Sequence, residues 1–316
     1  MLSSRTILKS LENVNQYLSQ FHVSKRSTYF ELLIAEVFSH IFYLPFYSSD
    51  NDDTKVYHRT VWCGKINPFS KASGREPDAI SYCYNFHLII EATLKTGTKQ
   101  WSQEFAQSIR HCKDFCSQNS INPKDVFILL VCTEINRDVY CSIKNNPRQE
   151  YRLIPIKVSE LTRILKTSIL AFTMKHLQLR RLFHEIFECV RDSSSIRDLT
   201  KSVDESICGW QENVLKLEKN TFIGVKSYEA MRKIGRTHIG VSEILQKLQD
   251  HWVVTQYFNI IGDKISNEIS EDSLVQQSLA SRLTPTYEGE ELFEPVPYVD
   301  FKGRSLRLID AVMRIK

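Results

Sequence analysis

The sequence predicts an α/β protein with a mixed central sheet flanked by helices, followed by a mainly helical C-terminal domain. Short apolar runs alternate with helical patterns between residues 79 and 165, which is typical of a layered α/β core. From residue 166 onward, apolar residues recur at helical spacing instead. A chain of 316 residues has room for two domains, and we place them at residues 1–165 and 166–316.

Local patterns give the elements of the first domain. Apolar residues at helical spacing predict one amphipathic helix over residues 1–26 and a stronger helix over residues 29–42. Short apolar runs predict strands at 57–63, 79–84, 86–90, 126–132 and 152–156. Further helices are expected after Gly97, with Thr98 as the N-cap, and at 135–143 and 158–165.

Two carboxylates stand at the ends of neighbouring strands. Asp78 precedes the run at 79–84, and Glu91 follows the run at 86–90. A hairpin of these runs brings both side chains to the same end of the sheet. Hard carboxylate oxygens suit Mg²⁺, with Mn²⁺ as an alternative, so this end is a candidate metal site.

The helix after Gly97 adds a polar stripe. Gln100, Glu104, Gln107 and His111 are spaced by four, three and four residues, so they share one helix face. Apolar residues elsewhere on this helix can pack on the sheet, which turns the stripe towards Asp78 and Glu91.

These residues carry a resemblance to a known family. The order Pro77-Asp78, then an apolar strand ending in Glu91-Ala92-Thr93, resembles the core of the PD-(D/E)XK nucleases. The longer string LIIEATLKTGTKQW, with Glu104 and SIRH behind it, is similar to the cleavage domain of type IIS restriction endonucleases of the AlwI group. It is also similar to the small subunit of heterodimeric enzymes with a separable nicking subunit. The resemblance covers about residues 28–165 and implies a restriction-endonuclease-like core.

The resemblance also implies a set of site residues. In that group an Asp, a strand Glu, a helix Glu and a His line the site, and the matching positions are Asp78, Glu91, Glu104 and His111. Asp78, Glu91 and Glu104 are the expected metal ligands. His111 is expected further along the DNA path, as a general base or as a partner of a phosphate or of Glu104.

Two further features of the group leave alternatives open. The Tyr-Phe-Glu context of an upstream site carboxylate matches Tyr29-Phe30-Glu31, but Thr28 and Glu31 also fit a capping box, and Glu36 is a second candidate. The Lys that PD-(D/E)XK nucleases usually carry two residues after the strand Glu is Thr93 here, as it is in the AlwI group, so Lys95, Lys99 or a second metal must supply positive charge.

Basic and amide side chains suggest where DNA binds. Lys71 and Arg75 lie on the loop before Asp78, and Gln100 and Arg110 lie on the helix with the polar stripe. Residues 227–260 have the helix–turn–helix–strand outline of a winged helix. The cations at its turn are Arg232, Lys233 and Arg236. The second domain is therefore expected to bind DNA or a partner.

Composition excludes some classes. With 41 basic and 37 acidic residues the net charge is only +4, which is compatible with DNA but does not require it. No apolar stretch is long enough to span a bilayer, and no signal peptide is evident. The 8 cysteines form no CxxC pair, so we expect a reduced, cytoplasmic protein.

The leading hypothesis is a Mg²⁺-dependent DNA endonuclease, specifically a type IIS-like restriction or nicking subunit. One site cuts one strand of double-stranded DNA, so we expect a homodimer or a heteromeric partner nuclease or recognition subunit. The alternatives are a transposon-end or defence-system nuclease subunit, and a catalytically silent subunit for DNA binding or assembly.

Overall fold

The computed structural model describes residues 3–49, 58–66, 69–145, 151–171, 176–234, 238–240, 260, 286–287, 290–291, 293–296 and 312–315. The chain falls into two compact units. Residues 1–169 and 174–210 form the first, and residues 170–173 and 211–316 form the second. The first unit therefore extends beyond residue 165, the boundary expected from the sequence, and includes α7 (His176–Asp192).

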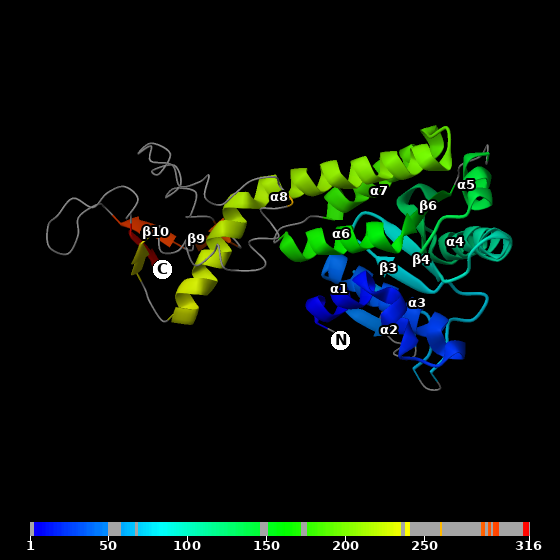
Figure 1. Cartoon of the computed structure of the whole chain (residues 1–316), viewed down its shortest axis with the longest axis horizontal. Helices are drawn as coiled ribbons and strands as arrows, with labels where there is room; N and C mark the ends of the chain where they lie inside the picture. The colour runs from blue at the N-terminus through cyan, green and yellow to red at the C-terminus, as the bar shows by residue number, and fades with distance from the viewer. Residues whose placement is uncertain are drawn as a thin grey trace, which may run out of the picture. The chain divides into compact units, whose positions relative to one another are not determined.

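The core of the first unit is a mixed six-stranded sheet (Figure 1). Its strands follow chain order: β1 (Phe46–Ser48), β2 (Arg59–Trp62), β3 (Ala79–Tyr82), β4 (His87–Thr93), β5 (Val126–Cys132) and β6 (Arg152–Lys157). β2, β3 and β4 are antiparallel neighbours. β1 runs parallel to β2. At the other side of the sheet, β4, β5 and β6 run parallel to one another. This arrangement confirms the predicted α/β class with a mixed sheet. β1 is not among the strands predicted from the sequence, and it is only three residues long.

Helices cover the sheet unevenly. α3 (Arg26–Phe42) packs on β1 to β4, and α4 (Ala106–Asn119) contacts β4 and β5. The remaining helices of this unit are α1 (Ser4–Glu12), α2 (Val14–Ser19), α5 (Arg137–Lys144), α6 (Val158–Leu170) and α7, with the first part of α8 (Ile196–Ile234). β5 is buried at every residue, and β4 at all but its first. β2 and β3 instead alternate buried and half-buried residues, so one of their faces is partly open.

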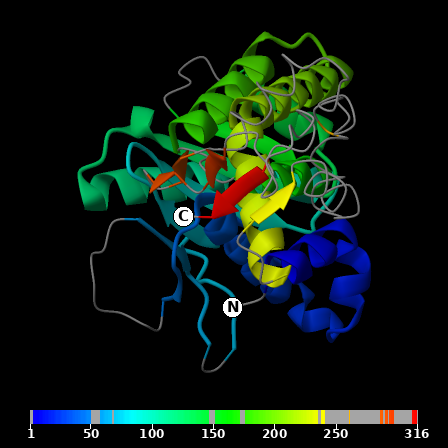
Figure 2. The same ribbon diagram turned by 90° about the vertical axis from the view of Figure 1, so that its left-hand side faces the viewer.

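The N-terminal segment differs from the single predicted helix. It consists of α1, α2 and a short 3₁₀ turn, Val23–Lys25, and Figure 2 shows the first two in dark blue beside each other. α1 ends at Asn13, where the backbone leaves the helical region (φ −121°, ψ 47°) and the side-chain amide donates to the Lys9 carbonyl. Local bonds of this kind compete with helix propagation.

Two predicted caps are also wrong. α3 begins at Arg26, so Thr28 lies inside the helix and forms no capping box with Glu31. Thr98 is already helical, and the helix that follows opens with a π turn, Gln100–Phe105, before continuing as α4.

The C-terminal unit is described in part. Residues 228–234 are the end of the long helix α8, not a separate short helix. Beyond it, β7 (His238–Gly240) and β10 (Phe293–Val296) both pair with β11 (Val312–Ile315), and β8 (Thr286–Tyr287) pairs with β9 (Glu290–Glu291). Most of the predicted winged-helix segment, including its turn at 235–237, lies outside the described residues. None of the helices in the described ranges is both long and apolar enough to cross a bilayer.

Candidate active site

The β3–β4 hairpin forms one end of an acidic cavity. Ala79 pairs with Ile90, so Asp78 and Glu91, the next residues outward, lie side by side. A cavity of about 420 Å³ opens at this point. Its acidic lining includes Glu31, Asp78, Glu91 and Glu104, and its other polar residues include Lys71, Lys95 and Gln107. The structure thus brings together the four carboxylates that the sequence analysis singled out.

Each carboxylate reaches the cavity from a different element. Glu91 is in β4 and Asp78 directly precedes β3, where Asp78 Oδ2 accepts the Ala92 N–H at 2.8 Å. Glu31 comes from α3 and is only 5% exposed. Of the two interpretations of Glu31, the structure supports a site carboxylate and not a member of a capping box. Glu104 comes from the π turn. Glu36, the second upstream candidate, does not line the cavity.

His111 is bonded to Glu91. Its Nδ1 lies 2.6 Å from Glu91 Oε1, and the residue is 1% exposed. The bonded partner of His111 in the structure is thus Glu91 and not Glu104, and its roles as a general base or as a phosphate contact stay predictions. Burial lowers the pKa of His111, so the ring is neutral near pH 7. An ionised Glu91 can only accept a hydrogen bond, so His111 Nδ1 then carries the proton.

Positive charge comes from the loop after β4. Lys95 Nζ lies 2.6 Å from Glu104 Oε1, and the Lys95 N–H donates to Thr93 Oγ1 at 3.0 Å. Thr93, which stands where related nucleases carry Lys, therefore helps to hold Lys95 in place. Lys99 is exposed and does not line the cavity, so the structure gives it no role there.

The acids raise one another's pKa. Burial is the largest cause for Glu31, Asp78 and Glu91. The charge of Asp78 then adds to the rise at Glu31, whose pKa reaches about 9. The charge of Glu91 acts likewise on Asp78, where the Ala92 N–H opposes it, and the charge of Glu104 acts likewise on Glu91. Such a cluster favours protons or a cation over free carboxylates.

The residues fit a divalent cation. The cavity supplies hard oxygen ligands from Asp78, Glu91 and Glu104, as Mg²⁺ requires. Glu31 Oε2 is buried without a hydrogen-bond partner, which leaves one more oxygen for an ion or its water. Among the described residues, no group of three His, Cys, Asp or Glu side chains is arranged to hold a metal ion as it stands. Water and substrate would therefore supply part of the coordination of an ion in this cavity.

The predicted DNA-binding residues divide into four groups. Lys71 lines the cavity, and Arg75 lines a neighbouring groove. Arg110 Nη2 donates to the Gly74 carbonyl at 2.8 Å, so it braces the loop before Asp78.

The prediction that Gln100 binds DNA is wrong. Gln100 is fully buried, and its amide bonds the backbone at Glu134 and at two other residues, so it has no free group for DNA. Arg232 and Lys233 are in α8, with undescribed side chains, and Arg236 lies outside the described residues.

Sheet, helices and acidic cavity define a restriction-endonuclease-like nuclease. The model of the AlwI restriction endonuclease family matches residues 5–164, half of the 316-residue chain, and the chain belongs to this family. Membership implies hydrolysis of DNA. A comparison with curated proteins finds no match. Among solved structures, the chain is similar to the small subunit (R.BspD6I2) of the heterodimeric restriction endonuclease R.BspD6I. The identity is 17% and the TM-score 0.47, over 66% of this chain and 99% of that one.

Proposed function

We propose that the chain is a Mg²⁺-dependent DNA endonuclease that serves as a restriction or nicking subunit of a type IIS-like enzyme. One observation carries the proposal: Glu31, Asp78, Glu91 and Glu104 surround a single cavity. Burial and mutual repulsion raise the pKa of three of them, Glu31, Asp78 and Glu91. A structural cluster would pair these acids with cations, whereas this one keeps oxygens available for an ion and a phosphate.

Asp78, Glu91 and Glu104 hold the cation in this proposal. When bound, the ion supplies positive charge at the scissile phosphate and makes water a stronger nucleophile. His111 fixes the orientation of Glu91 through the Nδ1 bond. Lys95 places its ammonium beside Glu104 and can offset charge that develops on the phosphate.

Glu31 keeps a proton at neutral pH until the cation binds. Its pKa of about 9 means that the acid form dominates near pH 7 in the free protein. Binding of the cation then competes with this proton, so the affinity for Mg²⁺ rises with pH. Glu31 faces the ion from the α3 side, opposite the π turn that supplies Glu104.

A single site of this kind cuts one strand. A double-strand break therefore needs a second copy of the chain or a partner nuclease, and a recognition subunit or the C-terminal unit must choose the sequence. The chain acting alone is expected to nick DNA, which matches a nicking or small-subunit role.

The test is incubation of purified protein with supercoiled plasmid and Mg²⁺, followed by separation of nicked and linear products. We expect nicked circles with Mg²⁺, none with EDTA, and none from Asp78→Asn under either condition. Retention of DNA binding without any nicking, across Mg²⁺ and Mn²⁺, would instead identify a silent DNA-binding subunit. A matched control is Glu160→Gln, which changes a buried acid outside the cavity.

A further inference from the structure

A second groove lies beside the acidic cavity, on the half-open face of β2 and β3. The buried residues of these strands alternate with half-buried ones, and the half-buried set Arg59, Val61, Ile80 and Tyr82 lines a groove of about 550 Å³. α4 forms its other wall. Since α4 contacts β4 and β5, this face of β2 and β3 is left partly uncovered.

The floor of the groove holds an unusual arginine. The Cζ atom of Arg59 lies 5.9 Å from the ring centroid of Tyr47 and 5.6 Å from that of Tyr82. Arg59 Nε is buried and has no hydrogen-bond partner. Throughout the described ranges, no carboxylate forms an ion pair with Arg59. The two rings thus fix the guanidinium by cation–π contact, and because Nε is shielded, contact with a ligand is left to the two terminal nitrogens.

The groove is continuous with the acidic cavity. Ser73 and Glu76 line both, and Arg75 lines the groove from the same loop. Along β3, Tyr82 is three residues beyond Ala79, and Arg59 is its register partner. At about 3.3 Å per residue, Arg59 lies roughly 10 Å from the cavity end of the hairpin. One DNA strand advances about 3.4 Å per nucleotide along the helix axis. Because the strand also winds around the axis, its neighbouring phosphates are about twice this far apart, so roughly 10 Å spans one or two phosphates.

We propose that this groove receives the DNA strand being cut, and that Arg59 binds a backbone phosphate of this strand one or two nucleotides from the scissile bond. The inference rests on the proposed nuclease function and adds a substrate contact to it. A planar guanidinium with free donors matches a phosphate better than it matches a base edge in this open setting. Arg75 adds a second cation on the rim. Glu76 and Asp114 also line the groove, and their charges would repel a phosphate that lies close to them.

The first measurement is the salt dependence of binding to a short DNA duplex in EDTA, which requires no cleavage. Arg59→Gln should weaken binding about tenfold and lower the slope of log K against log salt by about one. Arg59→Lys keeps the charge but loses the planar stacking, so it should recover most of the slope. The matched control is Arg152→Gln: Arg152 also lies over a ring, 5.2 Å from the Phe127 centroid, but it does not line the groove.

The second measurement locates the phosphate. Once the nick has been mapped, duplexes with one neutral methylphosphonate at successive positions are tested for binding. Wild type should lose affinity at a position one or two nucleotides from the nick, and Arg59→Gln should be insensitive at that position alone. Thermal melting of each variant shows whether it is folded, and Arg59→Lys serves as the reference if Arg59→Gln is not.

The outcomes separate this inference from the proposed function. An unchanged slope and unchanged methylphosphonate pattern in Arg59→Gln, with normal nicking, overturn the inference alone. A reduced slope with no nicking by wild type supports the groove and rejects the nuclease. If wild type binds no DNA, both fall. Normal DNA binding by Arg59→Gln together with lost association of a second protein subunit would make the groove a protein interface and overturn the inference.

Discussion

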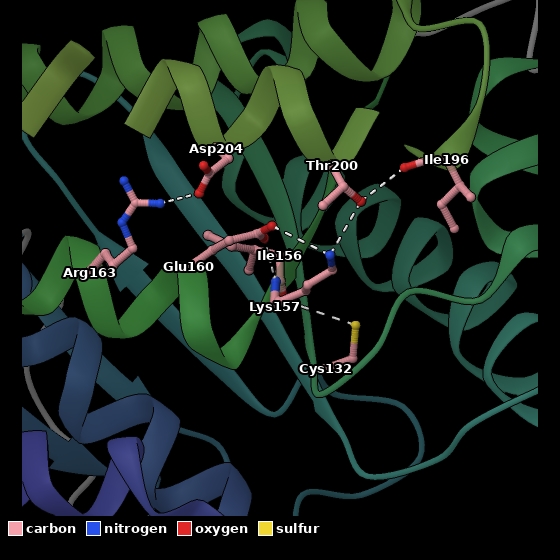
Figure 3. A network of polar contacts seen from close by, with 8 residues as sticks. All are labelled: Cys132, Ile156, Lys157, Glu160, Arg163, Ile196, Thr200 and Asp204. Carbon is pink, nitrogen blue, oxygen red and sulfur yellow. Dashed lines mark hydrogen bonds and ion pairs between the residues drawn. The ribbon is translucent and has the colours of Figure 1, made fainter. Parts of the chain in front are cut away.

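Two buried acids of the first unit, Glu160 and Glu91, have opposite surroundings. Glu160 opens α6 just after β6, and Figure 3 shows it among polar partners. Its Oε2 accepts the Lys157 N–H at 2.7 Å, and the Lys157 ammonium reaches Thr200 of α8 at 3.2 Å. Arg163, one turn further along α6, pairs with Asp204 of α8. Burial raises the pKa of Glu160, but the Lys157 N–H and ammonium oppose the rise.

Glu91 ends β4 among other acids instead. The charges of Glu104 and Glu31 add to the effect of burial on its pKa, and its direct partner is the neutral ring of His111. Both carboxylates are almost inaccessible to solvent, at 2% for Glu91 and 5% for Glu160. Burial of an acid therefore does not identify a site by itself. The difference lies in whether the neighbours neutralise the charge or leave it for an exogenous cation.

Removing a cavity acid should have the largest effect on activity. Asp78→Asn or Glu91→Gln should reduce Mg²⁺-dependent nicking by about 10³-fold or more, because each removes an ion ligand. The same changes should raise the melting temperature in EDTA, since they relieve repulsion among the acids. Plasmid nicking and thermal melting measure the two effects. Full activity of either variant would contradict the assigned ligand set.

Substitutions of Glu104 and His111, the two site residues on the helix after β4, should reduce nicking to different extents. Glu104→Gln should impair nicking severely, whereas His111→Ala should cost about 10- to 100-fold, because His111 acts through Glu91. Neither change should alter metal-independent DNA binding by more than about twofold. Nicking rates and binding in EDTA separate these quantities for each variant. A His111→Ala variant that nicks normally but binds DNA poorly would restore the phosphate-contact role expected from the sequence.

Changing the pH should alter the stability of the folded protein through the protonation of Glu31. Folded protein holds the Glu31 proton from its ordinary pKa of 4.5 up to about 9, whereas the unfolded chain releases it near 4.5. Unfolding in EDTA therefore releases a proton in this window, and stability falls as pH rises through it. Glu31→Gln should flatten this fall, and Mg²⁺ should stabilise wild type more at pH 8 than at pH 6. Melting curves at several pH values, with and without Mg²⁺, would show an unchanged profile if Glu31 is ordinary.

The smallest effect is expected at the paired acid. Glu160→Gln retains an oxygen for the Lys157 N–H but loses its charge, so stability should fall by about 1 kcal/mol. Nicking should stay within about twofold of wild type, because Glu160 does not line the cavity. Chemical denaturation and the plasmid assay test the two halves of this prediction. A large loss of nicking with normal folding would show that the network in Figure 3 acts on the site.

The sequence carries much of this site, for identifiable reasons. The hairpin that joins Asp78 to Glu91 is predictable because two dense apolar runs flank a single polar residue, Asn85. The helix stripe is predictable in part, since its spacing turns Glu104 and Gln107 towards the cavity. The partner of His111 is not, because periodicity gives a face and not the strand that the face meets. The winged-helix outline stays a prediction.

Two other features depend on tertiary structure. The capping-box pattern at Thr28 and Glu31 is real in the sequence, but α3 starts upstream at Arg26 and makes it irrelevant. The sequence does not predict a role for Arg59, because the contacts of Arg59 form only when β1 and β3 place a tyrosine on each side of it. The sequence shows only that each flanking strand contains an aromatic residue.

The π turn at Gln100–Phe105 makes the active site sensitive to chain length. Each of its hydrogen bonds spans five residues where an α-helix spans four, so the segment accommodates one residue more than regular winding would. Deleting one residue there would let the segment wind as a regular α-helix, and the helix beyond it would keep its phase. His111 would then stay beside Glu91, whereas the residues of the turn itself, Glu104 among them, would move to another part of the helix surface. For an engineer or for evolution, a deletion in this turn is thus mainly a change at Glu104, whereas a deletion in the regular part of α4 ahead of His111 would rotate everything beyond it by about 100°.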